Sequence, residues 1–422
     1  MKIFIVCSIF FLQGISAAPG LLSNQISQYG INGDLDQVAV VSNSADQNII
    51  AGNANQLAAL TRFRENFIYG NANQIGALNS NIRNYIFGKA FQLGVANFLN
   101  RNPHIEGPVS QVGVANFADN NNINGPFFET AVANIATGNS VAGASNQLGV
   151  ANIASRNNAK EFTQVGVANL GLENKISGTS LQEGAANVQS GSEIGGNSLQ
   201  YGKVNVNFNN KIAGNSLQTG LENFGIKNQI EGNHAQVGFG DWEIGSTIGG
   251  NSDQYGVGIL AWGNTVGGNA NQVGVGTLQG KSNIKGKLEQ VGAVNLNFIN
   301  EIKGNNQMTG VANIGSGNNI GGDDTAVGAA NVILNNNIKG NQKLTGAINV
   351  ASGNNVGGQQ DSNGLVNLGI NNESGGGQNM NGLLNIGSGN SAGGKKTMNG
   401  LVNIGSKDTE MSGLLNVPLT KK

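Results

Sequence analysis

The amino-acid sequence predicts an all-β chain folded as a single β-solenoid (β-helix) of about twenty coils, because a fixed period of this kind is typical of stacked repeats. A six-residue phrase, Gln-x-Gly-x-x-Asn or a close relative, returns every 18 residues, and its last position runs from Asn169 to Asn403. A shorter period of six residues is visible within each coil. The chain also contains 67 glycines, and a glycine inside a helix costs about 1 kcal/mol relative to alanine. Together these observations favour coils of short strands over helices.

The register extends towards the N-terminus with small slips that cancel. Asn97, Asn116, Asn134, Asn152 and Asn169 are separated by 19, 18, 18 and 17 residues. One residue is gained and one is lost, so the number of coils is kept. From Asn169 to Asn403, three positions of the series depart from asparagine: Asp241, Ile259 and Thr277.

The N-terminal segment, residues 1–17, has the features of a secretory signal peptide. Lys2 precedes an apolar run, and small residues follow before Ala18. The protein is therefore expected to be secreted and extracellular. Its only cysteine, Cys7, lies in this segment, so the mature chain would contain no disulfide even in an oxidising environment.

The rest of the sequence divides into three segments. Residues 18–49 are expected to form an N-terminal cap or irregular segment, and residues 50–408 the solenoid of 18-residue repeats. Residues 409–422 are expected to form a C-terminal cap and tail, because the last step of the series, from Asn403 to Asn416, spans only 13 residues.

Composition and charge narrow the classes of partner. The formal net charge is -1 and only 11% of residues are charged, which leaves no basic patch for nucleic acid or an anionic membrane surface. After the signal segment no apolar run approaches the roughly 18 residues needed to span a bilayer. The expected partners are further copies of the chain or other extracellular structural proteins, with no nucleic acid, membrane or small-molecule substrate.

The six-residue period predicts three inward columns per coil, occupied by Gln, a bulky apolar residue, and Ile or Val, as in Gln200, Val206 and Ile212. Residues two apart in a strand share a face, so the residue two positions before each column is also expected to point inward. Before the bulky column these residues are small: Ala168, Ala186, Ala312 and Ala330. Three short sides per coil, or two strands joined by arcs, fit this spacing equally well.

The glutamine column is predicted to point inward, because in later coils the same position holds residues such as Met308 and Leu344. A buried amide must be hydrogen-bonded, and identical amides stacked one coil apart can pair in a ladder. The predicted ladder residues are Gln92, Gln111, Gln147, Gln164, Gln182, Gln200, Gln218, Gln236, Gln254, Gln272 and Gln290, together with Asn97, Asn116, Asn134, Asn152, Asn169, Asn187, Asn205, Asn223, Asn295, Asn313, Asn331, Asn349, Asn367, Asn385 and Asn403.

The phrase Gln-x-Gly-x-x-Asn, as in Gln92 to Asn97, Gln182 to Asn187 and Gln290 to Asn295, resembles the centre of the curlin repeat. Curlins are secreted subunits whose repeats stack as a β-solenoid and whose copies join end to end as functional amyloid. The resemblance covers about a third of each coil, and curlin repeats are longer. It implies a solenoid and, more distantly, fibre formation.

The sequence gives no support for an enzyme, a cofactor or a metal site. Residues 276–282 resemble a phosphate-binding loop, but Val275 replaces its first glycine. His104 and His234 are the only histidines, too few for independent evidence of a triad or metal site. The acidic pairs Asp34 and Asp36, and Asp323 and Asp324, lack the spaced oxygen ligands of a calcium loop.

Two aromatic residues and one sequon complete the list of candidate sites. Trp242 falls in the predicted bulky inward column and is expected to serve packing, whereas the role of Trp262 is left open. Asn372 begins the sequon Asn-Glu-Ser, a possible glycosylation site on an expected coil corner.

Repetition without a distinguished site predicts a secreted structural protein that contributes to an extracellular fibre, coat, silk-like secretion or matrix. Amyloid-like self-assembly through open β-edges is one route to such a material. An ice-binding (antifreeze) β-solenoid is the alternative, because an outward row of amides follows the corner glycines, and a polysaccharide-binding β-helix is the third possibility. The outward row comprises Asn197, Asn215, Asn233, Asn251, Asn269, Asn305 and Asn341.

Overall fold

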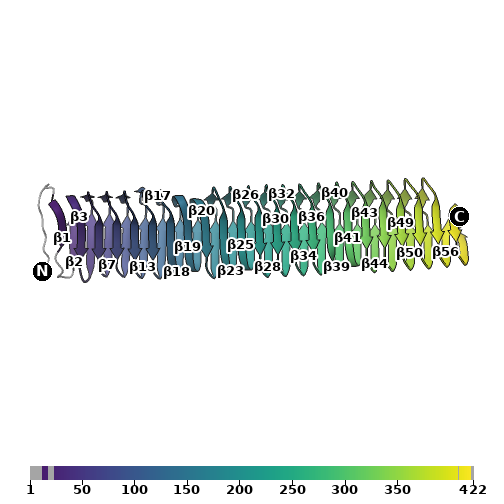
Figure 1. Cartoon of the computed structure of the whole chain (residues 1–422), viewed down its shortest axis with the longest axis horizontal. Coiled ribbons are helices and arrows are strands. Elements are labelled where there is room, and N and C mark those ends of the chain that lie inside the picture. Colours follow the sequence, from purple (N-terminus) through teal and green to yellow (C-terminus); the bar gives the residue numbers. More distant parts are fainter. Residues whose placement is uncertain (1–11, 18–22, 407, 420–422) are drawn as a thin grey trace. The chain divides into compact units, whose positions relative to one another are not determined.

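The computed structural model describes residues 12–17, 23–406 and 408–419, and among these residues it contains strands and no helix. The chain divides into two compact units, an N-terminal unit of residues 1–206 with 210–213 and a C-terminal unit of residues 207–209 with 214–422. In each unit, parallel strands stack coil upon coil (Figure 1). The predicted all-β solenoid is confirmed as the fold class.

One coil of the C-terminal unit shows the common plan. It contains β43 (Asp324–Val327), β44 (Ala330–Leu334) and β45 (Asn337–Ile338). Asn331 in β44 is in register with Asn313 of the preceding coil and Asn349 of the following one, so equivalent residues lie 18 positions apart. The coil therefore has three sides, two formed by longer strands and one by a two-residue strand, which settles the choice that the spacing left open.

Each side of this coil directs two side chains into the interior, and the alternation of a strand is interrupted at the corners. Ile333 and Asn336 are both buried although they are three positions apart. The corner residue Asn335 between them has φ 53°, a left-handed conformation in which L-residues other than glycine are uncommon. Equivalent corners use Lys227 with φ 54° or Gly353 with φ 64°.

The predicted bulky column is wrong in its orientation. Val206, Phe224 and Trp242 lie on the outer surface, and Trp242 is 42% exposed. The interior of this side holds Asn223 and Gly225 instead. The alanines expected inside, namely Ala168, Ala186, Ala312 and Ala330, are accordingly half-buried or exposed.

The cause of this error is the corner that contains the glycine of the repeated phrase. Gln218 and Asn223 both point inward although they are five positions apart. A six-residue spacing keeps a residue on the same face only if every side and corner has the same length. The corner at Gly220 shortens the step by one residue, and every side chain of the following strand changes face.

Stacking begins earlier in the chain than predicted. β2 (Ser23–Ser27) pairs with β4 (Ser42–Asp46), and β3 (Gly30–Val38) pairs with β5 (Ile49–Ile50). Residues 23–49, expected to be a cap or irregular segment, thus form regular coil strands. Residues 18–22 lie outside the described part of the chain.

The signal segment and the C-terminus differ from the regular coils. Residues 1–11 of the predicted signal lie outside the described residues, and its last six form β1 (Leu12–Ala17), which pairs with β3. At the other end, β57 (Thr409–Ser412) and β58 (Leu415–Leu419) pair with the coil before them, with Asn416 in register with Asn403. Within the described residues, no helix has the length and apolar character required to cross a bilayer.

Candidate functional site

The predicted asparagine residues form a buried ladder along one edge of the coils. Asn313 is typical: its Nδ2 donates to Oδ1 of Asn331 at 2.8 Å and to the backbone carbonyl of Val327 at 2.9 Å, and its Oδ1 accepts from Nδ2 of Asn295 at 2.7 Å. Every predicted ladder asparagine is buried. Each one therefore ties its own corner to the corner of the next coil.

The predicted glutamines form a second buried ladder with the opposite direction of donation. Gln182 Nε2 donates to Oε1 of Gln164, in the preceding coil, at 2.8 Å, and also to the carbonyl of Val188 at 3.1 Å. All predicted ladder glutamines are buried. After Gln290 the column is apolar except for Ser362, and glutamines of the neighbouring column take over the ladder: Gln342, Gln360 and Gln378.

A third ladder lies before the short third side, where asparagine side chains bind the backbone of adjacent coils. Oδ1 of Asn84 accepts from both the backbone N–H and Nδ2 of Asn66, at 2.9 and 3.0 Å. Nδ2 of Asn66 also donates to the carbonyl of Ala45 at 2.7 Å. Because a buried polar group without a partner costs free energy, these hydrogen bonds stabilise the buried amides of Asn66 and Asn84 and fix the coil register at the same time.

Three carboxyl groups interrupt these ladders inside the coils. Burial raises the pKa of Glu129, in the glutamine column, to about 8, although the hydrogen bond from Gln147 opposes the shift. Burial likewise raises the pKa of Asp324 to about 6 against a hydrogen bond from Asn306. The pKa of Asp241, which occupies the asparagine ladder, is raised to about 6 by burial.

A buried pair of a histidine and a glutamate lies next to Asp241 in the C-terminal unit. His234 Nε2 is 2.6 Å from Glu243 Oε2, and both side chains are fully buried. Gly225 makes room for the pair, because a Cβ at that position would overlap the carboxylate of Glu243. The sequence predicted no role for Glu243. Among the described residues, no group of three or more His, Cys, Asp or Glu side chains could hold a metal ion.

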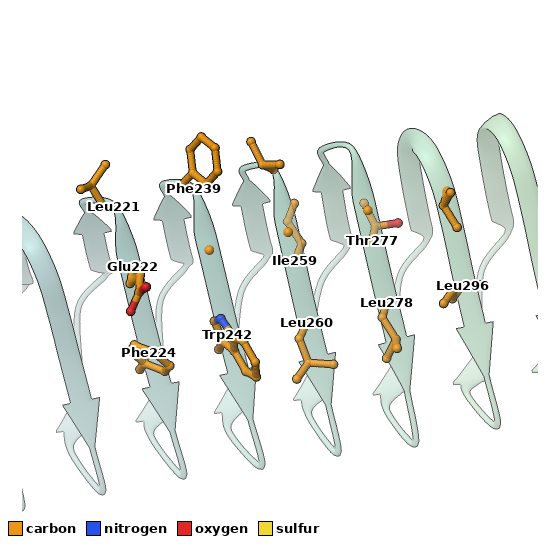
Figure 2. A pocket seen from close by; sticks show the side chains of 15 residues that line it. Leu221, Glu222, Phe224, Phe239, Trp242, Ile259, Leu260, Thr277, Leu278 and Leu296 are labelled. Atoms are coloured by element: carbon orange, nitrogen blue, oxygen red, sulfur yellow. The ribbon is translucent and has the colours of Figure 1, made fainter.

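An apolar groove lies on the surface of the C-terminal unit (Figure 2). Its floor, which we call the glycine floor, consists of Gly240, Gly258 and Gly276 on three successive coils. The groove has a volume of about 910 Å³. Its two walls are apolar rows that run across the coils: Leu221, Phe239 and Val257 on one side, and Phe224, Trp242, Leu260, Leu278 and Leu296 on the other.

The groove exists because side chains are missing from one outward position. The residue immediately before the ladder asparagine is Ala330, Ile348 or Val366 in later coils and glycine in these three. A Cβ placed at Gly258 or Gly276 would meet no atom within 4 Å. The same coils carry the three departures from asparagine, Asp241, Ile259 and Thr277, so the sequence contained a signal for this site. Trp242, expected in the interior, lines the groove instead.

A row of half-exposed apolar residues follows one corner of the coils, two positions before the ladder asparagine; we call it the corner row. In the N-terminal unit its members are 50–56% exposed on five successive coils: Val95, Val114, Val132, Val150 and Val167. In the C-terminal unit its members include Leu221, Phe239, Val257, Val275, Val311, Leu365, Leu383 and Leu401.

The other candidate residues from the sequence, Asn372, Trp262 and His104, are buried or lie against neighbouring side chains. Asn372 is fully buried and donates to the carbonyl of Ala351 at 2.8 Å, so its sequon is not at an accessible corner. Trp262 is half-buried, with Lys281 Nζ 5.5 Å from its ring. His104 packs beside Phe87, with ring centroids 5.5 Å apart. The segment that resembles a phosphate loop begins with β37 (Gly276–Gly280), an ordinary coil strand.

The outward asparagine row after the corner glycines is engaged in the fold. Oδ1 of Asn215 accepts the backbone N–H of Asn233 at 2.8 Å, and Oδ1 of Asn233 accepts that of Asn251 at 2.8 Å. The amide oxygens of Asn215 and Asn233 thus serve coil stacking.

Comparisons with family models, curated proteins and solved structures found no match to this chain.

Proposed function

We propose that the chain is a secreted structural repeat protein, a β-solenoid that contributes to an extracellular fibre, coat, silk-like secretion or matrix by self-association. The proposal is supported by the corner row. Half-exposed valine, leucine and phenylalanine side chains recur at the same corner on successive coils in both units. Apolar surface that is contiguous in this way is typical of interaction surfaces, because its burial removes unfavourable contact with water.

The ladders support the same proposal from the interior. Buried amide hydrogen bonds repeat from coil to coil, as between Asn295, Asn313 and Asn331. Such repeated bonds supply cohesion in a chain whose only cysteine, Cys7, lies in the predicted signal segment. A polypeptide built from equivalent coils presents equivalent surfaces along its length, which suits a material better than a single binding event.

Purified protein is expected to assemble as its concentration rises, which sedimentation velocity and electron microscopy would measure. Serine at Val114, Val132 and Val150 should weaken assembly roughly tenfold or more, because each change removes apolar surface from the corner row. The matched control replaces three exposed polar residues of the same unit by serine: Lys175, Glu193 and Lys211.

A protein that stays monomeric at every concentration would contradict self-association. The same samples separate the alternatives, since thermal hysteresis without assembly would favour ice binding. Retention on insoluble polysaccharide without assembly would favour a polysaccharide-binding β-helix.

A further inference from the structure

The occupant of the groove must be apolar. Among the residues that line it, Glu222 is the only charged one, and both walls consist of aliphatic and aromatic side chains. Small-molecule sites normally add several convergent polar groups to an apolar lining. A polar occupant here would lose its contacts with water without gaining hydrogen bonds in return. The groove therefore suits an apolar surface better than a polar ligand.

The occupant must also repeat at the spacing of the coils. Gly240, Gly258 and Gly276 are in register on β31 (Gly240–Ile244), β34 (Gly258–Trp262) and β37. Neighbouring parallel strands lie about 4.8 Å apart, so the floor offers three adjacent depressions at this interval. Another coil stack has side chains with the same interval.

The corner row of the C-terminal unit contains a matching set of three side chains, which we call the leucine ridge. Leu365, Leu383 and Leu401 are 55%, 51% and 53% exposed. They lie on successive coils, since the N–H of Leu383 donates to the carbonyl of Leu365 at 3.0 Å and β53 (Leu384–Ser388) pairs in register with β56 (Val402–Ser406). Their next neighbours on the surface are the uncharged residues Val366, Leu384 and Val402.

We propose that the groove receives the leucine ridge of a second copy of this chain, with the C-terminal units of the two copies side by side and antiparallel. Leu365, Leu383 and Leu401 of one copy then lie over Gly276, Gly258 and Gly240 of the other. Because each copy has one groove and one ridge, a two-fold axis forms both contacts at once and closes the dimer. This inference rests on the proposed self-association and adds a contact in the C-terminal unit to the one proposed for the N-terminal corner row.

The coils between the groove and the ridge are complementary in the same register. Placing Leu383 over Gly258 also places Val311 opposite Ala330, and Ile348 opposite Ala293. Val311 is 62% exposed and Ile348 is 49% exposed, while both of their opposing residues are alanines. At these two positions a large side chain thus faces a small one, which favours close packing between the two surfaces.

Filling the floor tests the inference without disturbing the coil. Gly258→Val and Gly276→Val add side chains into open space, at a position where Val366 occurs naturally. We expect the dissociation constant of the dimer, measured by sedimentation equilibrium, to rise at least tenfold. The control Ala151→Val makes a comparable addition at the same coil position in the N-terminal unit and should leave association unchanged.

Complementation gives the decisive measurement. Leu383→Ser removes one side chain of the leucine ridge, and Gly258→Val fills one depression of the glycine floor. The homodimer of either variant therefore has two defective contacts. A mixture of the two variants regains one intact contact, and its heterodimer should be tighter than either homodimer. In a Trp262→Phe background Trp242 is the only tryptophan, and its emission should shift to the blue as dimers form.

The outcomes separate this inference from the proposed function. Association that is unchanged by the filled floor, or a mixture no tighter than its components, would overturn the groove contact while self-association stood. Association lost with Val132→Ser but kept with Leu383→Ser would assign the contact to the N-terminal corner row and overturn the leucine ridge. A wild-type protein that never associates would overturn both proposals.

Discussion

Replacing Asn313 by Asp is expected to destabilise the coils around it by on the order of 3 kcal/mol at neutral pH. The substitution preserves shape but removes the Nδ2 donor that serves Asn331 Oδ1 and the carbonyl of Val327. Three acceptors would then face one another inside the coil, one of them charged. Hydrogen exchange resolved to these coils, together with thermal unfolding, would measure the loss.

Lowering the pH should partly restore the stability of the Asn313→Asp variant. A buried carboxyl has a raised pKa, so the variant should regain stability as the pH falls through that value and the group gains an O–H donor. The exposed ladder supplies the control: Asn381 Nδ2 donates to Asn363 Oδ1 at 2.9 Å at the surface, and Asn381→Asp should cost less than about 1 kcal/mol because water solvates the charge. Equal losses for the two variants would refute the importance of the buried ladder.

The natural Asp241 shows why one carboxyl is tolerated in this ladder. Its Oδ1 accepts from Asn223 at 2.7 Å, and the next ladder position is Ile259, which offers no acceptor to oppose it. In the Asn313→Asp variant, by contrast, the new carboxylate would face the amide oxygen of Asn331. The consequence of an aspartate thus depends on the residue in the following coil.

Replacing Glu129 by Gln is expected to stabilise the N-terminal unit at neutral and alkaline pH by on the order of 3 kcal/mol. Glu129 lies in register between Gln111 and Gln147. It accepts from Gln147 Nε2 at 2.7 Å, but its other oxygen and Oε1 of Gln111 have no hydrogen-bond partner. Glutamine would supply the missing donor permanently.

The pH dependence of wild-type stability follows from the direction in which burial shifts the pKa of Glu129. Burial raises the folded-state pKa of Glu129 from 4.5 to about 8, so the folded protein binds a proton more tightly than the unfolded chain. Stability from this group is complete below pH 4.5 and declines as the pH rises to about 8. Denaturant unfolding across this range should show a larger decline in the wild type than in Glu129→Gln, because Asp241 and Asp324, whose pKa values burial raises to about 6, are present in both proteins.

A surface substitution provides the comparison. Glu183 is exposed on the outer face beside the ladder residue Gln182. Glu183→Gln should change stability by less than about 0.5 kcal/mol at any pH. If Glu129→Gln behaved in the same way, Glu129 would have to be ionised without cost in the folded state, and the proposed role of its proton would be wrong.

The interior of each coil was predictable where the sequence repeats a polar residue type. Gln182 and Asn313 recur at positions that only stacking can explain, and a buried amide has few ways to be satisfied except by its copy in the next coil. The direction of donation was not predictable, because both directions satisfy the same column.

The groove was partly encoded in the sequence. Asp241, Ile259 and Thr277 marked the coils in which the ladder changes, and Gly240, Gly258 and Gly276 preceded them by one position. These glycines form a floor only because their position points outward. The six-residue period placed the strand that contains these glycines in the opposite phase, and so the apolar wall that includes Phe224 and Trp242 was expected in the core.

Periodicity along the chain was enough to establish the all-β solenoid, the coil length and the identity of the amides that stack, because each of these depends on spacing alone. The face that the bulky apolar column occupies became known only from the folded coil. A strand reverses its faces with every single residue added or removed, and the corners differ in length and in left-handed residues such as Asn335. The surface that this protein presents to a partner is therefore set at its corners.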